Sequence, residues 1–326
     1  MPRRVLIDTD PGVDDALALL YALRSPELHV AALTTVSGNV PVQRATRNAF
    51  TVLSLLPEHK RPVVAEGAEA PLVKQAAHAS FLHGEDGLGG VEALLGKDGR
   101  RLYFPERVEP SQQRAEDAIL QFAVDSPEPP TLIALGPLTN IAAALRKDPA
   151  AMSRVDRIVL MGGAVCVSGN ITPAAEFNMH VDPHAAAEVF DSGLPLTVVG
   201  LDVTRQARLS RDSIAQAGAG STRIGRFLQD STRGLFDFAQ RFQTEPSIPL
   251  HDPLAVGIAE DPALAACQTL HVVVETEGRH TEGMTVADRR PLRPECKARP
   301  NADVCLEVDG QRFLNRFLER MLCRDL

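Results

Sequence analysis

The chain has 326 residues, of which 44% are hydrophobic and 23% are charged, and its formal net charge is -8. This charge offers no basic surface to nucleic acid or an anionic membrane, and no apolar run approaches the roughly 20 residues that span a bilayer. A small molecule is therefore the expected partner. The first residues lack the apolar stretch of a secretory signal, which predicts a cytoplasmic location.

The five cysteines are scattered, odd in number and without a C-x-x-C pair: Cys166, Cys267, Cys296, Cys305 and Cys323. This pattern favours neither a disulfide framework nor a zinc site. We expect free thiols.

Short runs rich in β-branched residues alternate with segments of helical period through the first two thirds of the chain. Strands are predicted at 4–9, 29–35, 63–64, 131–135, 157–161 and 196–199, and helices at 13–23, 42–56, 116–124, 138–145 and 183–190. Such alternation is typical of β-α units around a buried parallel sheet. It predicts an α/β fold with an open, mostly parallel central sheet flanked by helices, related to the Rossmann fold.

Helices are expected to dominate after about residue 210, with strands at 270–274 and 304–308 and a final helix at 313–322. No shift in composition marks a boundary, so we expect one domain over 1–326, with an α/β core to about residue 205. Two segments, 78–90 and 162–178, show neither the helical period nor the alternation of a strand, and we expect irregular loops there. Long irregular loops in a compact α/β protein are more often functional than not.

Four carboxylates lie within eight residues where the first strand turns into a helix: Asp8, Asp10, Asp14 and Asp15. In open α/β sheets this edge binds ligands. Pro11 and Gly12 permit a tight turn, so that Asp10 can converge with Asp14 or Asp15. Converging carboxylates repel one another unless a cation lies between them.

Oxygen ligands without a suitably spaced His or Cys favour calcium or magnesium over zinc, and calcium tolerates irregular cages better. The alternative is structural: Asp14 and Asp15 would favour the helix N-terminus through its dipole, while Asp8 and Asp10 face water. Capping, however, needs one or two acids and not four.

The turn Asp8-Thr-Asp10-Pro-Gly-Val-Asp14-Asp15 resembles the amino-terminal fingerprint of the inosine-uridine preferring nucleoside hydrolases. Further blocks resemble that family in its order: Val36-Ser-Gly-Asn39-Val, His83-Gly-Glu-Asp-Gly-Leu-Gly, Ala134-Leu-Gly-Pro-Leu-Thr-Asn-Ile-Ala, Met161-Gly-Gly, Ala175-Glu-Phe-Asn178, Asp182-Pro and His251-Asp252-Pro. The blocks extend from residue 5 to about residue 255. Their joint match is specific, although Asp-x-Asp alone would be weak.

The resemblance implies that the enzyme cuts the N-glycosidic bond of ribonucleosides with the help of Ca²⁺. Asp10, Asp15 and Asp252 would donate carboxylate oxygens to the metal, together with the main-chain carbonyl of Leu135. A bound water and the ribose hydroxyls would complete the shell. Asp10 is the candidate general base for that water.

The resemblance also implies which residues bind ribose: Asp14, Asn39, Asn170, Glu176 and Asn178. The spacing of Glu176 and Asn178 would let both reach the same side from an extended loop. Each Asn could instead be a turn or capping residue.

Two histidines are candidates at the base. His251, beside Asp252, is the candidate proton donor to the departing base because imidazole titrates near neutral pH. His83 could reach the base from its Gly-rich loop, or simply be solvated.

The region around Phe236 and Phe238 departs from the family pattern. Members that accept purines well often carry tyrosines there, and phenylalanine can stack on a base but cannot donate a proton. The purine-specific branch is similar in using indole rings to hold the base, and this chain has no tryptophan. Retention of His251 resembles the nonspecific and pyrimidine-preferring branches. Uridine or cytidine is thus the first expectation, with inosine left open.

Two other classes of function compete with this interpretation. A haloacid-dehalogenase-like phosphatase also places Asp-x-Asp after its first strand, but it wants a hydroxyl residue where this chain has Gly12. A non-enzymatic calcium- or ribose-binding protein would need the same ligands without a poised base. The family resemblance further implies a homo-oligomer, a tetramer or dimer, and a role in nucleoside salvage.

Overall fold

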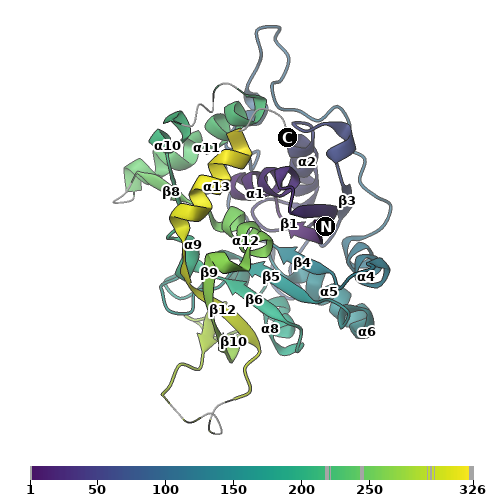
Figure 1. The fold of residues 1–326 in the computed structure, drawn as a ribbon, viewed down its shortest axis with the longest axis vertical. Helices are drawn as coiled ribbons and strands as arrows, with labels where there is room; N and C mark the ends of the chain where they lie inside the picture. Colours follow the sequence, from purple (N-terminus) through teal and green to yellow (C-terminus); the bar gives the residue numbers. More distant parts are fainter. Residues whose placement is uncertain are drawn as a thin grey trace.

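The protein is described from a computed structural model that covers residues 2–216, 220, 222–242, 246–291, 293, 296 and 298–322. Its centre is an eight-stranded sheet with the order β3-β2-β1-β4-β5-β6-β12-β9 (Figure 1). The strands are β1 (Arg3–Thr9), β2 (Leu28–Thr35), β3 (Val63–Glu66), β4 (Thr131–Ala134), β5 (Arg157–Met161), β6 (Leu196–Val199), β12 (Ala302–Val308) and β9 (Ala265–Leu270). Every neighbouring pair is parallel except β12 and β9. The predicted mostly parallel sheet is confirmed.

The order in which the chain adds strands to the sheet reverses between β1 and β4. From β1 the chain proceeds outward through β2 to β3, and it then returns to β4 on the other side of β1. At such a switch point the connections leave a crevice at the carboxyl ends of the strands, which is where open α/β sheets bind ligands. The turn after β1 and the segment after β4 both open into it.

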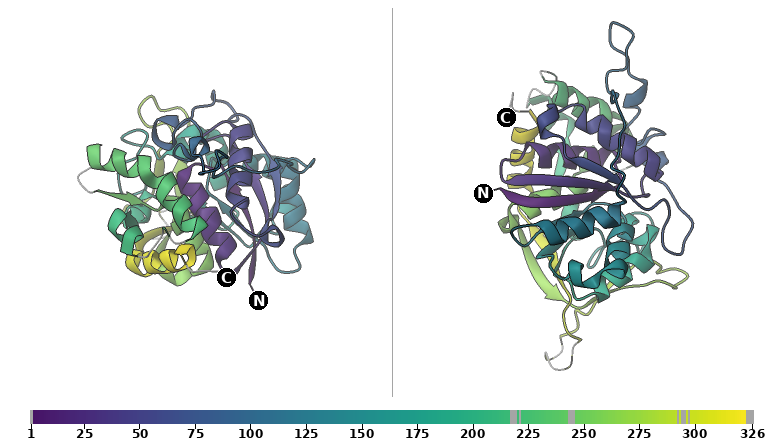
Figure 2. Two further views of the ribbon diagram at one scale, coloured as in Figure 1. Left: turned by 90° about the horizontal axis from the view of Figure 1, so that it is seen from above. Right: turned by 90° about the vertical axis from the view of Figure 1, so that its right-hand side faces the viewer.

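Two helical layers cover the two faces of the sheet. On one face, α1 (Val13–Arg24), α2 (Val42–Leu53), α11 (Arg223–Phe242), α12 (His251–Glu260) and α13 (Gly310–Leu322) contribute to one buried apolar cluster. On the other face, α4 (Ala115–Asp125), α5 (Thr139–Lys147) and α8 (Pro183–Asp191) contribute to a second cluster. In the right-hand view of Figure 2 the purple β1 lies between the purple helices and the teal ones.

The remaining elements are short. They are η1 (Glu58–Lys60), α3 (Ser80–His83), η2 (Val91–Ala93), α6 (Pro149–Met152), α7 (Phe177–Val181), α9 (Leu201–Thr204), β7 (Arg208–Ser210), α10 (Arg211–Gln216), β8 (Ser247–Pro249), η4 (Pro262–Leu264), β10 (Val272–Val274) and β11 (Thr285–Ala287). β7 pairs with β8 and β10 with β11 in two small antiparallel sheets. Of the helices that the structure describes, none combines the length and apolarity needed to cross a membrane.

The structure corrects several predicted boundaries. The helix predicted at 42–56 ends at Leu53, because Pro57 follows closely and disfavours helical geometry in the residue before it. The single strand predicted at 270–274 is two strands, since β9 pairs with β12 as far as Leu270 and β10 then pairs with β11. The last helix begins at Gly310, where Asp309 accepts a hydrogen bond from the Arg312 amide.

Candidate active site

The turn between β1 and α1 is held by the carboxylate of Asp15, the third residue of α1. One oxygen accepts hydrogen bonds from the Thr9 hydroxyl at 2.6 Å and the Asp10 amide at 3.2 Å. The other accepts from the Gly12 amide and the Asn39 side chain, both at 3.0 Å. A carboxylate in the first turn of a helix is favoured by the free amides there. The Asp15 carboxylate therefore holds the end of β1 against the first turn of α1.

Asp10 lies at the end of β1, fully buried. One carboxylate oxygen accepts a hydrogen bond of 2.5 Å from the Asn39 amide, whereas its Oδ1 is buried without a hydrogen-bond partner in the described part of the chain. Glycines make room for both oxygens, because a Cβ atom at Gly38 or Gly136 would collide with this carboxylate. Burial raises the pKa of Asp10 well above its usual range, and the charge of Asp15 raises it further.

The first turns of α1 and α12 meet beside this carboxylate. Asp14 of α1 accepts a hydrogen bond of 3.0 Å from the Asp252 amide of α12. Burial raises the pKa of Asp14 to about 8. Burial also raises the pKa of Asp252, and the charges of Asp15, Asp14 and Asp10 raise it further. Residues more than 230 positions apart thus form one cluster of carboxylates.

A cavity of about 260 Å³ opens above the cluster, close to the usual lower size for small-molecule sites. Nine of the eleven predicted site residues line it: Asp14, Asn39, His83, Leu135, Asn170, Glu176, Asn178, His251 and Asp252. The other two, Asp10 and Asp15, are joined to Asn39 by the hydrogen bonds above. The fold therefore gathers all eleven around one cavity.

His251 begins α12 and is oriented by a residue that sequence reasoning missed. Its Nδ1 lies 2.7 Å from the hydroxyl of Thr204, the last residue of α9. Burial lowers the pKa of His251 to about 3, and the charges of Arg205 and Arg208 contribute. This contradicts the expectation that the ring titrates near neutral pH, because desolvation of the partly buried ring and the nearby guanidinium groups both disfavour its protonated form.

His83 ends α3 and is buried rather than solvated. Its Nδ1 accepts a hydrogen bond of 3.1 Å from the Val13 amide in the first turn of α1. Burial lowers the pKa of His83 to about 4, so the ring is neutral and its proton resides on Nε2. The segment 78–90 is thus not wholly irregular, since α3 carries this residue to the cavity wall.

Glu176 and Asn178 do not lie in an extended loop. Glu176 is the N-cap of α7, and its carboxylate accepts from the amides of Asn178 at 2.9 Å and Gly163 at 3.0 Å. The Asn178 side chain donates to the Leu135 carbonyl at 2.6 Å. Glu176 faces the cavity because a capping side chain bends back over the first helical turn, and Asn178 lies within that turn, held by its bond to Leu135; strand alternation plays no part. The sequence-based reason for their placement is wrong, although the placement itself is seen.

The loop 162–178 is fastened by two further residues that no motif indicated. Asp202 accepts hydrogen bonds from the amides of Val165 at 2.9 Å and Cys166 at 2.6 Å. Arg205 donates to the carbonyl of Gly169 at 2.8 Å. Asn170 follows at the cavity wall, where its side-chain oxygen accepts from the Phe177 amide at 2.9 Å. Asn170 therefore satisfies the first amide of α7 and lines the cavity as well.

The apolar end of the cavity includes α11. Leu235 and Phe238 line it, together with Phe81, Leu82, Ile171 and Phe177. Phe236, by contrast, is buried with the guanidinium of Arg211 over its ring at 5.0 Å. Of the two phenylalanines considered from the sequence, Phe238 alone faces the cavity.

The residues at the cavity floor fit a hard cation. No three His, Cys, Asp or Glu side chains in the described ranges already have the geometry of a metal site. The buried and unpaired Asp10 Oδ1 and the mutual repulsion of Asp10, Asp15 and Asp252 nevertheless call for positive charge. The donors of these three side chains are carboxylate oxygens, which suit a hard cation such as calcium or magnesium better than zinc.

The family model for inosine-uridine preferring nucleoside hydrolases matches residues 5–315 of the chain. The chain belongs to this family. It is therefore an N-glycosyl hydrolase that acts on nucleosides. The family assignment sets aside the phosphatase alternative, which would also have left His251 and Glu176 without roles.

Curated relatives and solved structures agree with this assignment. The chain is 38% identical to the pyrimidine-specific ribonucleoside hydrolase RihA of Photobacterium profundum, over 98% of this chain and 99% of the relative. It is also 38% identical to the non-specific ribonucleoside hydrolase RihC of Salmonella agona, over 98% and 97%. A plant nucleoside hydrolase superposes with a TM-score of 0.89 at 34% identity, covering 99% of this chain and 100% of the other.

Proposed function

We propose that this nucleoside hydrolase cleaves ribonucleosides to free base and ribose in a calcium-dependent reaction, with pyrimidine nucleosides preferred or no strong preference, as part of nucleoside salvage or catabolism. The observation that carries the proposal is the carboxylate cluster of Asp10, Asp14, Asp15 and Asp252 beneath a cavity of nucleoside-binding size. An unliganded cluster of this kind is electrostatically unfavourable, and a cation together with a sugar would relieve it.

The residues that would hold the cation are Asp10, Asp15 and Asp252, with the carbonyl oxygen of Leu135. Calcium suits this set because it accepts six to eight oxygen ligands in irregular geometry. When bound, the ion would acidify a water molecule and bind ribose hydroxyls. The hydrogen bond from the Asn178 side chain fixes the position of the Leu135 carbonyl, and Leu135 lines the cavity.

Asp10 is proposed as the general base. Its Oδ1 is the buried acceptor without a partner, whereas Asn39 holds the other oxygen in place. A carboxylate fixed in this manner keeps one lone pair available for the proton of an attacking water.

The sugar would lie between the carboxylate cluster and the loop 162–178. Cleavage builds positive charge on the anomeric carbon, so acceptors and anions close to the ring stabilise the transition state. Asp14, Asn39, Asn170, Glu176 and Asn178 are the proposed ribose contacts. The hydrogen bonds that already fix Glu176 and Asn178 mean that little reorganisation accompanies binding.

His251 is proposed to assist departure of the base. If the Thr204 hydroxyl donates to Nδ1, the ring proton resides on Nε2. Because the ring is neutral, it supplies a hydrogen bond to the base as negative charge develops there, rather than the full proton of an imidazolium. His83 presents a second Nε2 proton at the wall of the same cavity.

The preference for pyrimidines rests on the names of the relatives and on the apolar end of the cavity. Pyrimidine-specific and non-specific enzymes are among the relatives at 38% identity. Resemblance of fold does not decide the matter, since a purine-preferring enzyme of Gardnerella vaginalis superposes with a TM-score of 0.87 at 34% identity. Phe238 offers a stacking surface, and the chain contains no tryptophan for a purine sandwich.

The test is a turnover assay with uridine, cytidine and inosine, in which free base and ribose are measured with and without a calcium chelator. We expect release that the chelator abolishes and calcium restores, and a higher kcat/KM for uridine or cytidine than for inosine. Chelator-insensitive release would contradict the metal requirement. Binding of ribose without any release would favour the non-enzymatic binding protein instead.

A further inference from the structure

Two cysteines face each other across the outer strands of the sheet, away from the residues assigned above. Cys267 of β9 and Cys305 of β12 are direct partners in the antiparallel register. Their sulfur atoms are 3.2 Å apart. As predicted, both are free thiols, as are Cys166 and Cys296, whereas Cys323 lies outside the described residues.

The backbone already has the geometry of a disulfide. Direct partners in an antiparallel pair have Cα atoms about 4.5–5.5 Å apart, which lies within the range of about 4.4–6.8 Å found for disulfides. The sulfur atoms need to approach by only about 1.2 Å to reach the bonded distance. Small side-chain rotations suffice, and no strand has to move.

The two thiols differ in exposure and in charge. Cys267 is exposed on the edge strand, whereas Cys305 is fully buried in the apolar cluster below α13. The contact between the two thiols lowers the pKa of Cys267, as does the guanidinium of Arg157, whereas the same contact and burial raise the pKa of Cys305. Arg157 itself buries an Nε atom that has no partner in the described part of the chain. The exposed Cys267 sulfur is thus the one that an external reagent can reach first, and the Cys305 sulfur lies next to it in the interior.

We propose that Cys267 and Cys305 form an oxidisable thiol pair, converted to an intramolecular disulfide by exchange with a low-molecular-weight disulfide of the glutathione class. The Cys267 sulfur attacks oxidised glutathione, forms a mixed disulfide and releases one reduced glutathione, which takes the Cys267 proton. The Cys305 sulfur then attacks the Cys267 sulfur and displaces a second glutathione, which takes the Cys305 proton. Two electrons pass from the protein to the reagent.

The disulfide would join the edge strand β9 covalently to the sheet and close a loop of 38 residues. A cross-link over that separation restricts the unfolded chain and raises the Tm by about 5 °C in a protein of this size. Edge strands are otherwise the part of a sheet that opens and mispairs most readily.

The pair is tested by anaerobic incubation with oxidised glutathione, alkylation of the remaining thiols, and peptide mass mapping without reduction. We expect a cross-linked peptide that contains residues 267 and 305, the loss of two hydrogens from the intact mass, and the rise in Tm. The control variant Cys166→Ser lacks an exposed thiol elsewhere and should cross-link normally.

Single variants test the order of the steps. Cys305→Ala should stop at one glutathione adduct on Cys267, and Cys267→Ala should leave Cys305 unmodified in the folded protein. Separate alkylated peptides for residues 267 and 305 would overturn the proposal. Glutathione adducts confined to Cys166 and Cys296 would overturn it as well.

Discussion

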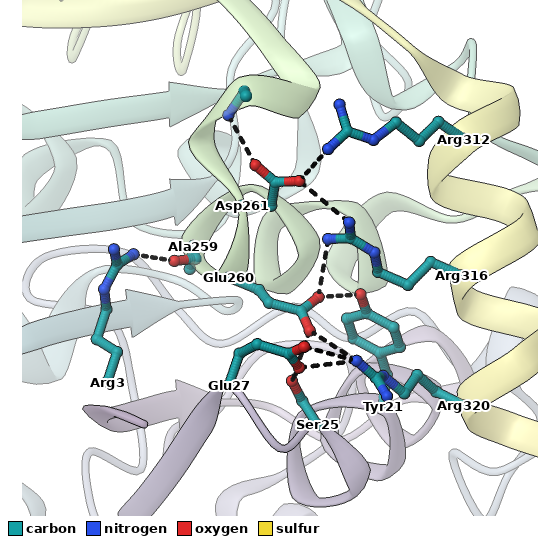
Figure 3. Close-up of polar contacts among 11 residues, drawn as sticks. Arg3, Tyr21, Ser25, Glu27, Ala259, Glu260, Asp261, Arg312, Arg316 and Arg320 are labelled. Carbon is teal, nitrogen blue, oxygen red and sulfur yellow. Dashed lines mark hydrogen bonds and ion pairs between the residues drawn. The ribbon is translucent and has the colours of Figure 1, made fainter. Parts of the chain in front are cut away.

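Helices α1 and α12 lie side by side, and each end of the pair contains buried carboxylates. At their N-terminal ends Asp14, Asp15 and Asp252 face one another. Burial and the charges of the neighbouring carboxylates raise the pKa of Asp252. At their C-terminal ends Glu260 lies among two arginines, two hydroxyl groups and the carboxylate of Glu27 (Figure 3), and burial together with the neighbouring Glu27 raises its pKa. The Tyr21 hydroxyl and the Ser25 hydroxyl both donate to it, and Arg316 and Arg320 lie 3.6 Å away.

The contrast separates a structural carboxylate from functional ones. Glu260 is almost fully buried, and α13 supplies the two arginines that compensate its charge. Arg320 also pairs with Glu27 at 2.8 Å, so the cluster ties the start of β2 to α13 and α12. Among the described residues, no lysine or arginine forms an ion pair with Asp10, Asp14, Asp15 or Asp252, so we expect a bound cation to neutralise this end. The predictions below test the two ends separately, and the last experiment compares them directly.

The largest effect is expected for Asp10→Asn. The substitution keeps the shape of the side chain but removes the base and one anionic ligand, so kcat/KM for uridine should fall by about 10³-fold or more. Steady-state kinetics at saturating calcium measure it. Asp98→Asn, on an exposed loop, is the matched control and should retain full activity. A loss below tenfold in the Asp10 variant would remove Asp10 from the role of base.

A large loss of stability is expected for Glu260→Ala. Removal of the acceptor leaves the Tyr21 hydroxyl and two arginines without their shared partner, which costs about 3 kcal/mol of unfolding free energy. Guanidinium unfolding monitored by circular dichroism gives this value. Glu319→Ala, exposed on the same helix as the arginines, should change it by less than about 0.5 kcal/mol. Equal effects in the two variants would deny the cluster its structural role.

A moderate loss of activity is expected for Thr204→Val, which removes the hydroxyl beside His251 at nearly constant shape. Residues that orient a functional group typically contribute about 10- to 100-fold, and we expect a loss near tenfold in kcat for uridine. Thr204→Ser should restore most of it. A 4-nitrophenyl riboside, whose leaving group departs without assistance, should be cleaved at the wild-type rate. If that substrate is affected equally, Thr204 does not act through His251.

The smallest effect concerns pH in the metal-free protein. Burial raises the pKa of Asp14 to about 8 and that of Asp8 to about 7, so the folded state binds protons more tightly than the unfolded state. The lowered pKa values of His83 and His251 oppose this effect between pH 8 and 5, so the carboxyl contribution is isolated by comparison with Asp14→Asn. As the pH falls from 8 to 5, metal-free wild type should gain about 1 kcal/mol or more of unfolding free energy relative to that variant. Guanidinium unfolding at the two pH values measures the difference, and an equal pH dependence in the two proteins would contradict the raised pKa of Asp14.

The sequence predicted the sheet and most of the site because the informative residues sit in contiguous blocks at strand ends. Asp10 follows β1 directly and Leu135 follows β4, so their meeting at one edge is a consequence of parallel strand order. Convergence of Asp252 with Asp14 could be predicted only through the family resemblance, since no periodicity connects positions so distant in the chain.

The residues that sequence reasoning missed belong to elements too short to leave a pattern. Thr204 and Asp202 lie in α9, which has four residues, and they act through single hydrogen bonds. The state of His251 was also beyond sequence reasoning, because its pKa depends on burial and on Arg205 and Arg208 across the fold. Local motifs identify a residue, whereas its protonation is set by tertiary surroundings.

The most direct test of the account compares calcium-induced stabilisation in three proteins: wild type, Asp252→Asn and Glu260→Gln. At calcium equal to about 100 times its Kd, wild type should gain about 2.7 kcal/mol of unfolding free energy. Glu260→Gln should gain the same amount from a lower starting stability, and Asp252→Asn should gain almost nothing. A full gain in Asp252→Asn, or no gain in wild type, would show that the carboxylates at the N-terminal ends of α1 and α12 do not form a calcium site.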